Sequence, residues 1–331
     1  MSQVDFDKLF SSFQNIKVGV IGDVMLDTYW WGKVERISPE APVPVVAVSN
    51  KEQRIGGAGN VALNVAALGC FVSVISVVGD DGDGKQVKDL LSESKIDTTY
   101  LLESKDRITT NKIRIISRNQ HMMRLDAEIT TPLNDSDDKA LITSFENYLL
   151  EQKPDIVILE DYNKGVLSLH IIQEVIRLCK ENNVLTAVDP KRKNFFSFVG
   201  ADIFKPNLHE AKEGLNIISE DVSDELLHEI HKELSARLKH SISFITLSEK
   251  GIFYETVDEH KIIPTHIRSI ADVSGAGDTV IAVSSVVYAS TRDVHLMAEM
   301  ANIAGGLVCE EVGTVAIDKN KLLQECKLLL K

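Results

Sequence analysis

Short apolar runs alternate with longer amphipathic segments along this chain. Between two such runs, the segment at 168–183 places its apolar residues at helical spacing, with charged residues on the opposite face. The runs are apolar at nearly every position, as in strands buried on both faces, and each ends in glycine or an acid. The pattern predicts β–α–β units and an α/β fold with a central, mostly parallel sheet flanked by helices. The predicted central strands are "KVGVIGD" (17–23), "FVSVISVVGD" (71–80), "DIVILED" (155–161) and "LTAVDP" (185–190).

Two segments lack this alternation. "APVPVVAVS" (41–49) and "TTNKIRIISRNQHMMRLD" (109–126) have extended character with no helix inside them, and the prolines in and around the first suit an edge strand. We predict a small β flap, or lid, built from discontinuous segments at about 30–50 and 109–126. Surface hairpins without a role are the alternative. Because no repeat, low-complexity tract or flexible linker divides the chain, residues 1–331 are predicted to form one domain.

Acidic residues follow three of the predicted strands. Asp23, Asp161 and Asp189 fall at or just beyond the carboxyl ends of their runs. Parallel sheets bind ligands at this edge, so each acid is a candidate binding residue. A single acid in such a position is often only a helix cap, which is the structural alternative for each.

A first glycine-rich turn lies in "RIGGAGNVALNVAALG" (54–69). Gly56 and Gly57 allow a ligand to approach the backbone closely, and Asn60 can both donate and accept hydrogen bonds. The turn therefore resembles a polyol-binding turn, with a purely structural turn as the alternative. It is not a dinucleotide fingerprint, because the three-glycine spacing does not follow the first strand, and no Walker pattern occurs anywhere in the chain.

A second glycine-rich turn, "DVSGAGDTV" (272–280), leads into an apolar run typical of a buried helix. Glycine here costs chain entropy, which exposed backbone N–H groups or unusual dihedral angles can offset. Asp278 follows the two glycines directly. It can be an acid that favours the helix dipole, or a catalytic base built into a phosphate-binding helix start.

Composition narrows the classes of function. With 331 residues, of which 44% are hydrophobic, the chain can bury a large core. A net charge of −13 argues against nucleic-acid and anionic-membrane partners, so an anionic ligand must be held by a few local donors. The four cysteines lie far apart, without zinc or redox spacing, which indicates free thiols. No signal-peptide pattern or membrane-length apolar run is present, and we expect a cytoplasmic protein.

Three motifs together resemble one family, the ribokinase-like or PfkB-type carbohydrate kinases. They are "GGAGN", "KPNLHEA" (205–211) and "DVSGAGDTVIA", in this order, and the resemblance covers nearly the whole chain. The stretches "GDVMLDTYWWGKVERISPEAPVPVV", "SRNQHMMRLD", "DYNKG" and "VDPK" are most similar to the members that phosphorylate the anomeric oxygen of D-glycero-D-manno-heptose 7-phosphate. Many of these relatives also carry a nucleotidyltransferase domain with a His-x-Gly-His turn. This sequence has no such turn, so the resemblance is to the kinase half.

The resemblance implies a role for each candidate residue. Asp278 would be the general base, and the N–H groups of Gly275, Ala276 and Gly277 would form a hole for charge on the transferring phosphoryl group. The sugar side would comprise Asp23, Gly56, Gly57, Asn60 and Asp189, with Arg118, Asn119, Lys164 and Lys191 as candidates for the distal phosphate. The nucleotide side would comprise Asn207, Leu208, His209, Glu210, Ser248, Asn302 and Gly313.

The resemblance also implies cofactors and an assembly. ATP would bind with Mg²⁺, which Asn207 and Glu210 would organise through water, with a helix cap as the structural alternative. Asp272 and Ser274 are similar to a loop that binds a monovalent cation in some relatives, and K⁺ is the candidate ion. An apolar flap with unpaired edges predicts a homodimer.

The resulting expectation is an ATP-dependent kinase that makes heptose 1,7-bisphosphate for ADP-heptose and lipopolysaccharide-core synthesis. A PfkB kinase for another sugar phosphate or a nucleoside, and a non-catalytic sugar-binding regulator, are the alternatives.

Overall fold

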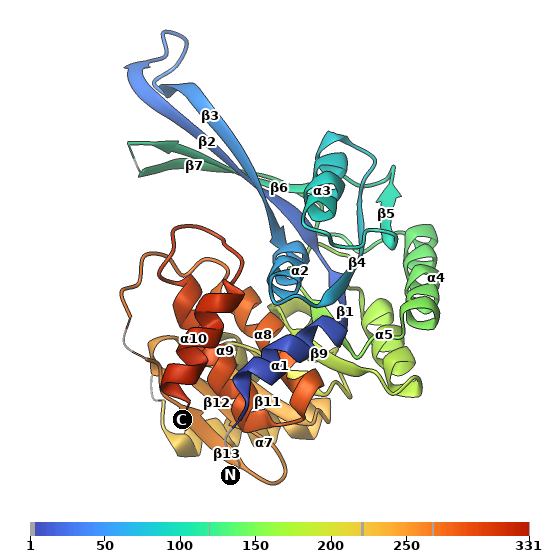
Figure 1. Ribbon diagram of the computed structural model, residues 1–331. Coiled ribbons are helices and arrows are strands. Elements are labelled where there is room, and N and C mark those ends of the chain that lie inside the picture. Colours follow the sequence, from blue (N-terminus) through green and yellow to red (C-terminus); the bar gives the residue numbers. More distant parts are fainter. Residues whose placement is uncertain (1–3, 119, 220–221, 267, 331) are drawn as a thin grey trace.

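The core of the protein is a large, mostly parallel sheet. A computed structural model describes residues 4–118, 120–219, 222–266 and 268–330. Within these ranges nine strands follow the order β13-β12-β11-β10-β9-β8-β1-β4-β5 (Figure 1). Neighbours from β5 to β11 are parallel, and β12 and β13 are added antiparallel, which confirms the predicted fold class. The strands are β1 (Lys17–Gly22), β4 (Phe71–Gly79), β5 (Leu101–Ser104), β8 (Ile156–Glu160), β9 (Leu185–Asp189), β10 (Ile203–Phe204), β11 (Ile242–Thr246), β12 (Ile252–Glu255) and β13 (His260–Ile263).

Helices cover both faces of this sheet. Side chains alternate between the faces of a strand, so Val18 and Val20 of β1 pack into one apolar core and Ile21 packs into the other. The first core is closed by α1 (Phe6–Ser12), α2 (Ala58–Ala67), α3 (Gly82–Glu93), α8 (Ala276–Thr291), α9 (Val294–Val308) and α10 (Lys319–Leu329). The second is closed by α4 (Asp135–Gln152), α5 (Leu169–Glu181), α6 (Leu208–Leu215) and α7 (Asp224–Leu238). Among the described residues, no helix has the length and apolar character needed to cross a membrane.

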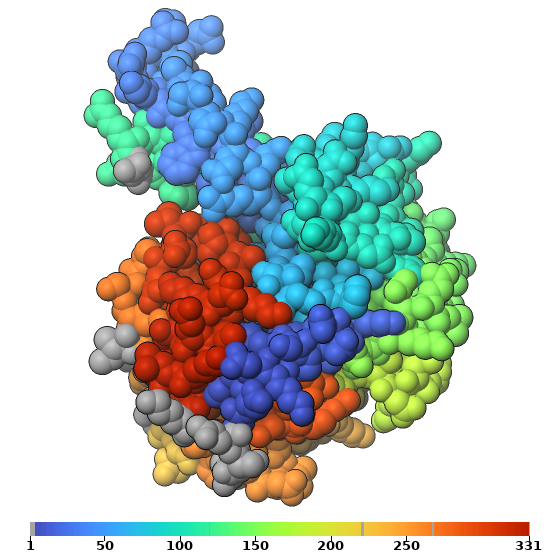
Figure 2. All heavy atoms as spheres, viewed as in Figure 1, coloured from blue at the N-terminus to red at the C-terminus, as the bar shows by residue number. Residues whose placement is uncertain are grey.

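A second, smaller sheet stands away from this body as the flap (Figure 2). Its strand order is β3-β2-β6-β7, with β2 antiparallel to β3 and parallel to β6. Only Asp23 separates the end of β1 from the start of β2, so the flap extends from the carboxyl edge of the main sheet. The first flap segment is longer than the predicted range of about 30–50, because the apolar residues that open β2 pair in the flap while packing into the body. The strands are β2 (Val24–Ile37), β3 (Pro44–Gly57), β6 (Thr110–Ser117) and β7 (Gln120–Ala127).

Candidate active site

The start of α8 lies where the sheet, α2 and the C-terminal loop meet. Gly275, at its N-cap, has a φ of +79°, a left-handed conformation that favours glycine. A side chain there would also press on Asn60 Nδ2 and Thr314 Cγ2, each 3.0 Å from the position of a Cβ. One of the predicted hole donors is engaged, because Ala276 N–H donates to the carbonyl of Val273 at 3.3 Å. The start of α8 therefore lies close to the first glycine-rich turn, which contributes Asn60.

Asp278, in the first turn of α8, is buried, with 5% of its surface exposed. Asn60 Nδ2 donates to Oδ2 at 2.7 Å, and the Tyr162 hydroxyl donates to Oδ1 at 2.8 Å. Burial raises the pKa of Asp278 to about 6, although both hydrogen bonds oppose the shift. A carboxylate with a pKa near the working pH, fixed at both oxygens, is suited to act as a general base. Sequence analysis identified Asp278 and Asn60 but not Tyr162.

Three buried carboxyl groups form an acid cluster at the carboxyl end of the sheet. Ligand atoms of Glu160, Asp189 and Asp278 all lie within 4.8 Å of one another. Burial raises the pKa of Glu160 well above its usual value, and the charges of Asp189 and Asp278 add to the shift. Neither carboxyl oxygen of Glu160 has a hydrogen-bond partner among the described residues. Oxygen donors of this kind fit a hard cation such as Mg²⁺. Glu160 carried no signal in the sequence, because it reads as the last residue of an apolar strand.

Two lysines balance the acid cluster. Lys205 Nζ lies 2.9 Å from Asp189 Oδ2, and Lys191 Nζ lies 2.8 Å from Glu210 Oε1 and 3.5 Å from Asp189 Oδ1. Burial alone would raise the pKa of Asp189, but the two ammonium groups hold it below its usual value. Lys191, predicted to bind a distal phosphate, thus lies among carboxylates between the sugar side and the predicted nucleotide side.

Asn207 and Glu210 form a capping box at the start of α6. Glu210 N–H donates to Asn207 Oδ1 at 2.8 Å, and Asn207 N–H donates to Glu210 Oε2 at 2.9 Å. The cap uses one oxygen of Glu210, and the other faces Lys191. The helix cap, which was the structural alternative for these two residues, is present. Their contribution to Mg²⁺ binding stays a prediction.

The remaining residues predicted for the nucleotide side and for a cation lie in α6, in α9, in a 3₁₀ turn and in two loops. Asp272, Ser274 and Gly313 meet, since Asp272 Oδ1 accepts from the Ser274 hydroxyl at 2.8 Å and Oδ2 accepts from Gly313 N–H at 2.9 Å. Asn302, on α9, donates to the Pro264 carbonyl at 2.8 Å. Leu208 and His209 open α6, and Ser248 lies exposed in the 3₁₀ turn Ser248–Lys250.

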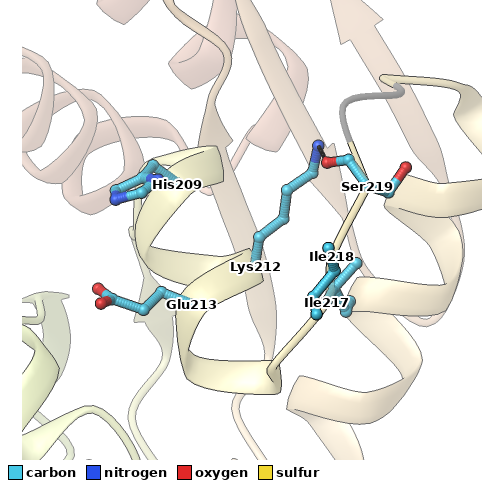
Figure 3. A pocket seen from close by; sticks show the side chains of 6 residues that line it. All are labelled: His209, Lys212, Glu213, Ile217, Ile218 and Ser219. Atoms are coloured by element: carbon cyan, nitrogen blue, oxygen red, sulfur yellow. Dashed lines mark hydrogen bonds between the residues drawn. The ribbon is translucent and has the colours of Figure 1, made fainter.

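A hollow of about 450 Å³ is lined by α6 and by the segment that follows it (Figure 3). Lys212 reaches across it and donates to the carbonyl of Ser219 at 2.9 Å. None of the carboxyl groups of the acid cluster lines it, so we place the candidate active site at Asp278 instead. The lining residues are His209, Lys212, Glu213, Ile217, Ile218 and Ser219.

Two acids lie near the residues predicted for the sugar side, and sequence analysis identified only one of them. Asp23 uses both carboxylate oxygens to accept backbone N–H groups of Tyr162, Lys164 and Val166, at 2.9 to 3.0 Å. It therefore holds the loop after β8. Asp27, the fourth residue of β2, forms an ion pair with Arg114 and faces Gly56. Gly57 has a φ of +60°, and a side chain there would overlap the Asp23 carbonyl.

Several cations lie on the flap side of Tyr162. Lys112 Nζ is 5.4 Å from the centre of the Tyr162 ring, and Lys164 Nζ is 2.7 Å from Glu128 Oε2. Burial lowers the pKa of Lys112, Asp27 opposes this, and Lys164 and Arg114 add to the lowering. Sequence analysis predicted Lys164 but missed Lys112 and Arg114, since both read as polar positions of an ordinary strand.

Arg118, a further predicted phosphate ligand, is not part of this cluster in the described structure. Arg118 lies exposed at the turn between β6 and β7, just beyond the pair Ser117 and Gln120. Asn119 lies outside the described residues.

Comparison with known proteins matches the chain to a family and to a fold. The model of the pfkB family carbohydrate kinases matches residues 15–321. The chain is 41% identical to "Bifunctional protein HldE" of Campylobacter fetus subsp. fetus (strain 82-40) over 90% of its own length, and it spans 64% of that protein.

Two solved structures share the fold. Phosphofructokinase-2 from Escherichia coli in complex with potassium has a TM-score of 0.80 at 17% identity, covering 96% of this chain and 100% of that one. Arabidopsis thaliana ribokinase complexed with ribose and ATP has a TM-score of 0.73 at 17% identity, covering 93% of this chain and 99% of that one.

Proposed function

The chain belongs to the pfkB family of carbohydrate kinases, and from this membership we propose that it transfers the terminal phosphoryl group of ATP to the anomeric hydroxyl of D-glycero-D-manno-heptose 7-phosphate. The product would be heptose 1,7-bisphosphate. The observation that carries the chemistry is the buried Asp278 carboxylate, held by Asn60 and Tyr162 beside the glycine turn of α8. The proposal concerns the kinase reaction alone, because the chain spans 64% of the matched relative.

In this mechanism Asp278 accepts the proton of the anomeric hydroxyl as its oxygen attacks. Asn60 and Tyr162 fix both carboxylate oxygens, so the base is oriented before the sugar arrives. The N–H groups at the start of α8 stabilise charge on the transferring phosphoryl group. The bond from Ala276 N–H to Val273 is long, at 3.3 Å, and a phosphoryl oxygen can compete with it.

A divalent cation has suitable donors near this base. Asn207, Glu210 and Asp189 would hold Mg²⁺, partly through water, at the end of the acid cluster that faces Lys191. When bound, Mg²⁺ would neutralise charge on the phosphates of ATP. Asp272 and Ser274 would hold K⁺ in the neighbouring loop.

Sugar recognition divides between the body and the flap. We assign the sugar hydroxyls to Asn60, the Gly56–Gly57 backbone and Asp27, because Asp23 already binds three backbone N–H groups. The distal phosphate would lie against Lys112 and Lys164, near Arg114. Charge-assisted donors at short range are needed, since the net charge of −13 repels a phosphorylated sugar at long range.

A substrate panel tests the proposal. The full chain is incubated with ATP, Mg²⁺ and, in turn, heptose 7-phosphate, heptose, fructose 6-phosphate, ribose and adenosine. ADP release is followed, and the product is identified by ³¹P NMR. We expect heptose 7-phosphate to give the highest kcat/KM and a new anomeric phosphate. Faster turnover of another acceptor would identify that acceptor as the substrate instead of heptose 7-phosphate. Sugar binding without any ADP release would favour a non-catalytic sugar-binding regulator.

The flap also supports an assembly. Every residue of β7 is exposed, including the apolar Met122, Met123 and Leu125, which a monomer would leave in water. We propose that the flap of a second copy covers them in a homodimer.

A further inference from the structure

A cluster of histidines lies at the end of the main sheet opposite the acid cluster. The strand register places Ser243 of β11 beside Glu255 of β12, and Glu255 beside His260 of β13. Residues directly opposite one another in an antiparallel sheet point to the same face, so these three side chains form a row. Helix α7 packs over this face (Figure 1) and presents His228 and His231, one turn apart.

The two helical histidines converge on one carboxylate oxygen. Glu255 Oε1 lies 2.6 Å from His228 Nδ1 and 3.9 Å from His231 Nε2. His260 lies beside His228, and the centres of their rings are 6.0 Å apart. Imidazole nitrogens and a carboxylate oxygen together are the donors that zinc prefers.

Glu255 is short of partners for a buried acid. Its side chain is only 6% exposed, and Oε2 has no hydrogen-bond partner among the described residues. No lysine or arginine of the described chain forms an ion pair with it, although burying a carboxylate without a cation is unfavourable. A cation bound between the imidazoles would supply the missing charge.

We infer that His228, His231 and Glu255 form a binding site for one divalent transition-metal ion of the zinc type. In a tetrahedral site with bonds of about 2.0 Å, ligand atoms lie about 3.3 Å apart. The separations of 2.6 and 3.9 Å fall on either side of this distance. The three ligand atoms do not all lie within 4.8 Å of one another, so the His228 ring must turn to bring its nitrogen into range of an ion held by His231 and Glu255. The His228 side chain is 57% exposed and free to adjust, and it gives the ion a path from solvent.

The surroundings of His231 fix its ligand atom. His231 Nδ1 lies 2.8 Å from the Ser243 hydroxyl oxygen, which also lies 2.6 Å from His240 Nε2. With Nδ1 donating to Ser243, the lone pair of the ring is on Nε2, the nitrogen that faces Glu255. Protein zinc sites typically use such a bond to orient the imidazole. His260 or water would complete the coordination.

Calorimetric titration of ZnCl₂ into the metal-free full chain at neutral pH tests the site. We expect one equivalent of Zn²⁺ per chain. The variants His228→Gln and Glu255→Gln each remove a ligand and should weaken binding by more than about 10-fold, while Ser243→Ala should weaken it by about 10-fold through His231. Anomalous scattering at the zinc edge from a soaked crystal should place the ion between His231 and Glu255.

The matched control is His170→Gln. His170 also contacts a carboxylate, with Nδ1 2.7 Å from Asp138 Oδ1, but it is a single histidine–acid pair. This variant should bind zinc like the parent. A parent that binds no zinc overturns the inference, and so does unchanged zinc binding in His228→Gln. The side chain of His228 is 57% exposed, so a folding defect would not explain a loss of binding in this variant.

Discussion

Charged residues are buried at the carboxyl end of the main sheet and exposed on β7, the edge strand of the flap. At the carboxyl end of the main sheet, Asp278, Asp189 and Lys205 are all buried, and each has a partner at 2.9 Å or less. On the flap, every residue of β7 is exposed, and the pair of Arg124 and Asp126 lies in solvent. Buried groups interact strongly and hold fixed positions, whereas exposed pairs contribute little.

This difference suggests that the body serves catalysis and that the flap serves recognition and assembly. In the proposed mechanism, the body would supply a preorganised base and a charge-binding turn, which phosphoryl transfer requires. The flap would supply cations for a phosphorylated substrate and exposed apolar surface for a second copy. Changes in the body should therefore act on the rate of reaction, and changes in the flap should act on recognition and assembly.

Asp278→Asn should show the largest effect. Asparagine has the shape of aspartate, and its amide oxygen can still accept a hydrogen bond, but it cannot accept the proton, so kcat should fall by roughly 10² to 10⁴. Steady-state kinetics measure the loss, and circular dichroism checks the fold. Asp293→Asn is the matched control, because Asp293 caps α9 by accepting from Leu296 N–H at 2.9 Å. Near-parent kcat in Asp278→Asn would end the assignment of the base.

Lys112→Ala and Lys164→Ala test recognition by the flap side. Loss of a charge-assisted phosphate contact costs about 2 to 3 kcal/mol, so kcat/KM for heptose 7-phosphate should fall by roughly 30- to 150-fold in each. The KM for ATP and turnover of unphosphorylated heptose should change little. Lys51→Ala is the control, since Lys51 also lies on the flap over an aromatic ring, 4.7 Å from the centre of Trp30. Equal losses for both sugars would show that these lysines do not read the phosphate.

The burial of Asp278 predicts a pH-dependent cost in stability. Its folded pKa of about 6 lies above the reference value of 3.8, so the stability that its protonated form contributes is present below pH 3.8 and lost as pH rises through about 6. From pH 4 to 7 the free energy of unfolding of Asp278→Asn should rise relative to the parent by up to about 3 kcal/mol. Urea unfolding at several pH values measures this, and a difference independent of pH would contradict it.

Leu125→Asp tests whether the exposed flap is an interface. Losing a buried leucine at a dimer contact costs about 1.5 to 3 kcal/mol, so the dimer should weaken by at least about 10-fold in sedimentation velocity. Leu150→Asp, on α4 of the body and also exposed, should leave the dimer intact. A parent that is monomeric at micromolar concentration with full activity would rule out the proposed clasp.

The sequence predicted the body better than the site. The four central strands and α5 follow from hydrophobic periodicity, which each segment carries within itself. Tyr162 contacts Asp278 across 116 positions, and no local pattern records such a meeting. Likewise, Asp23 and Asp27 are close together in the sequence. The chain passes from the main sheet to the flap between them, and this change of sheet determines which carboxylate faces Gly56.

Tyr162→Phe should give the smallest effect, and it separates positioning of the base from the base itself. The Tyr162 hydroxyl stabilises the ionised Asp278, so its removal should raise the pKa of Asp278 and move the acid limb of kcat/KM toward higher pH by about one unit. The loss in rate should therefore be about 10-fold below the limb and only a few-fold above it. Tyr100→Phe is the control, because its hydroxyl donates to Glu151 Oε2 at 2.7 Å, away from the acid cluster. A purely structural role for Tyr162 would lower the rate equally at all pH values, and the body would then fix its base through Asn60 alone.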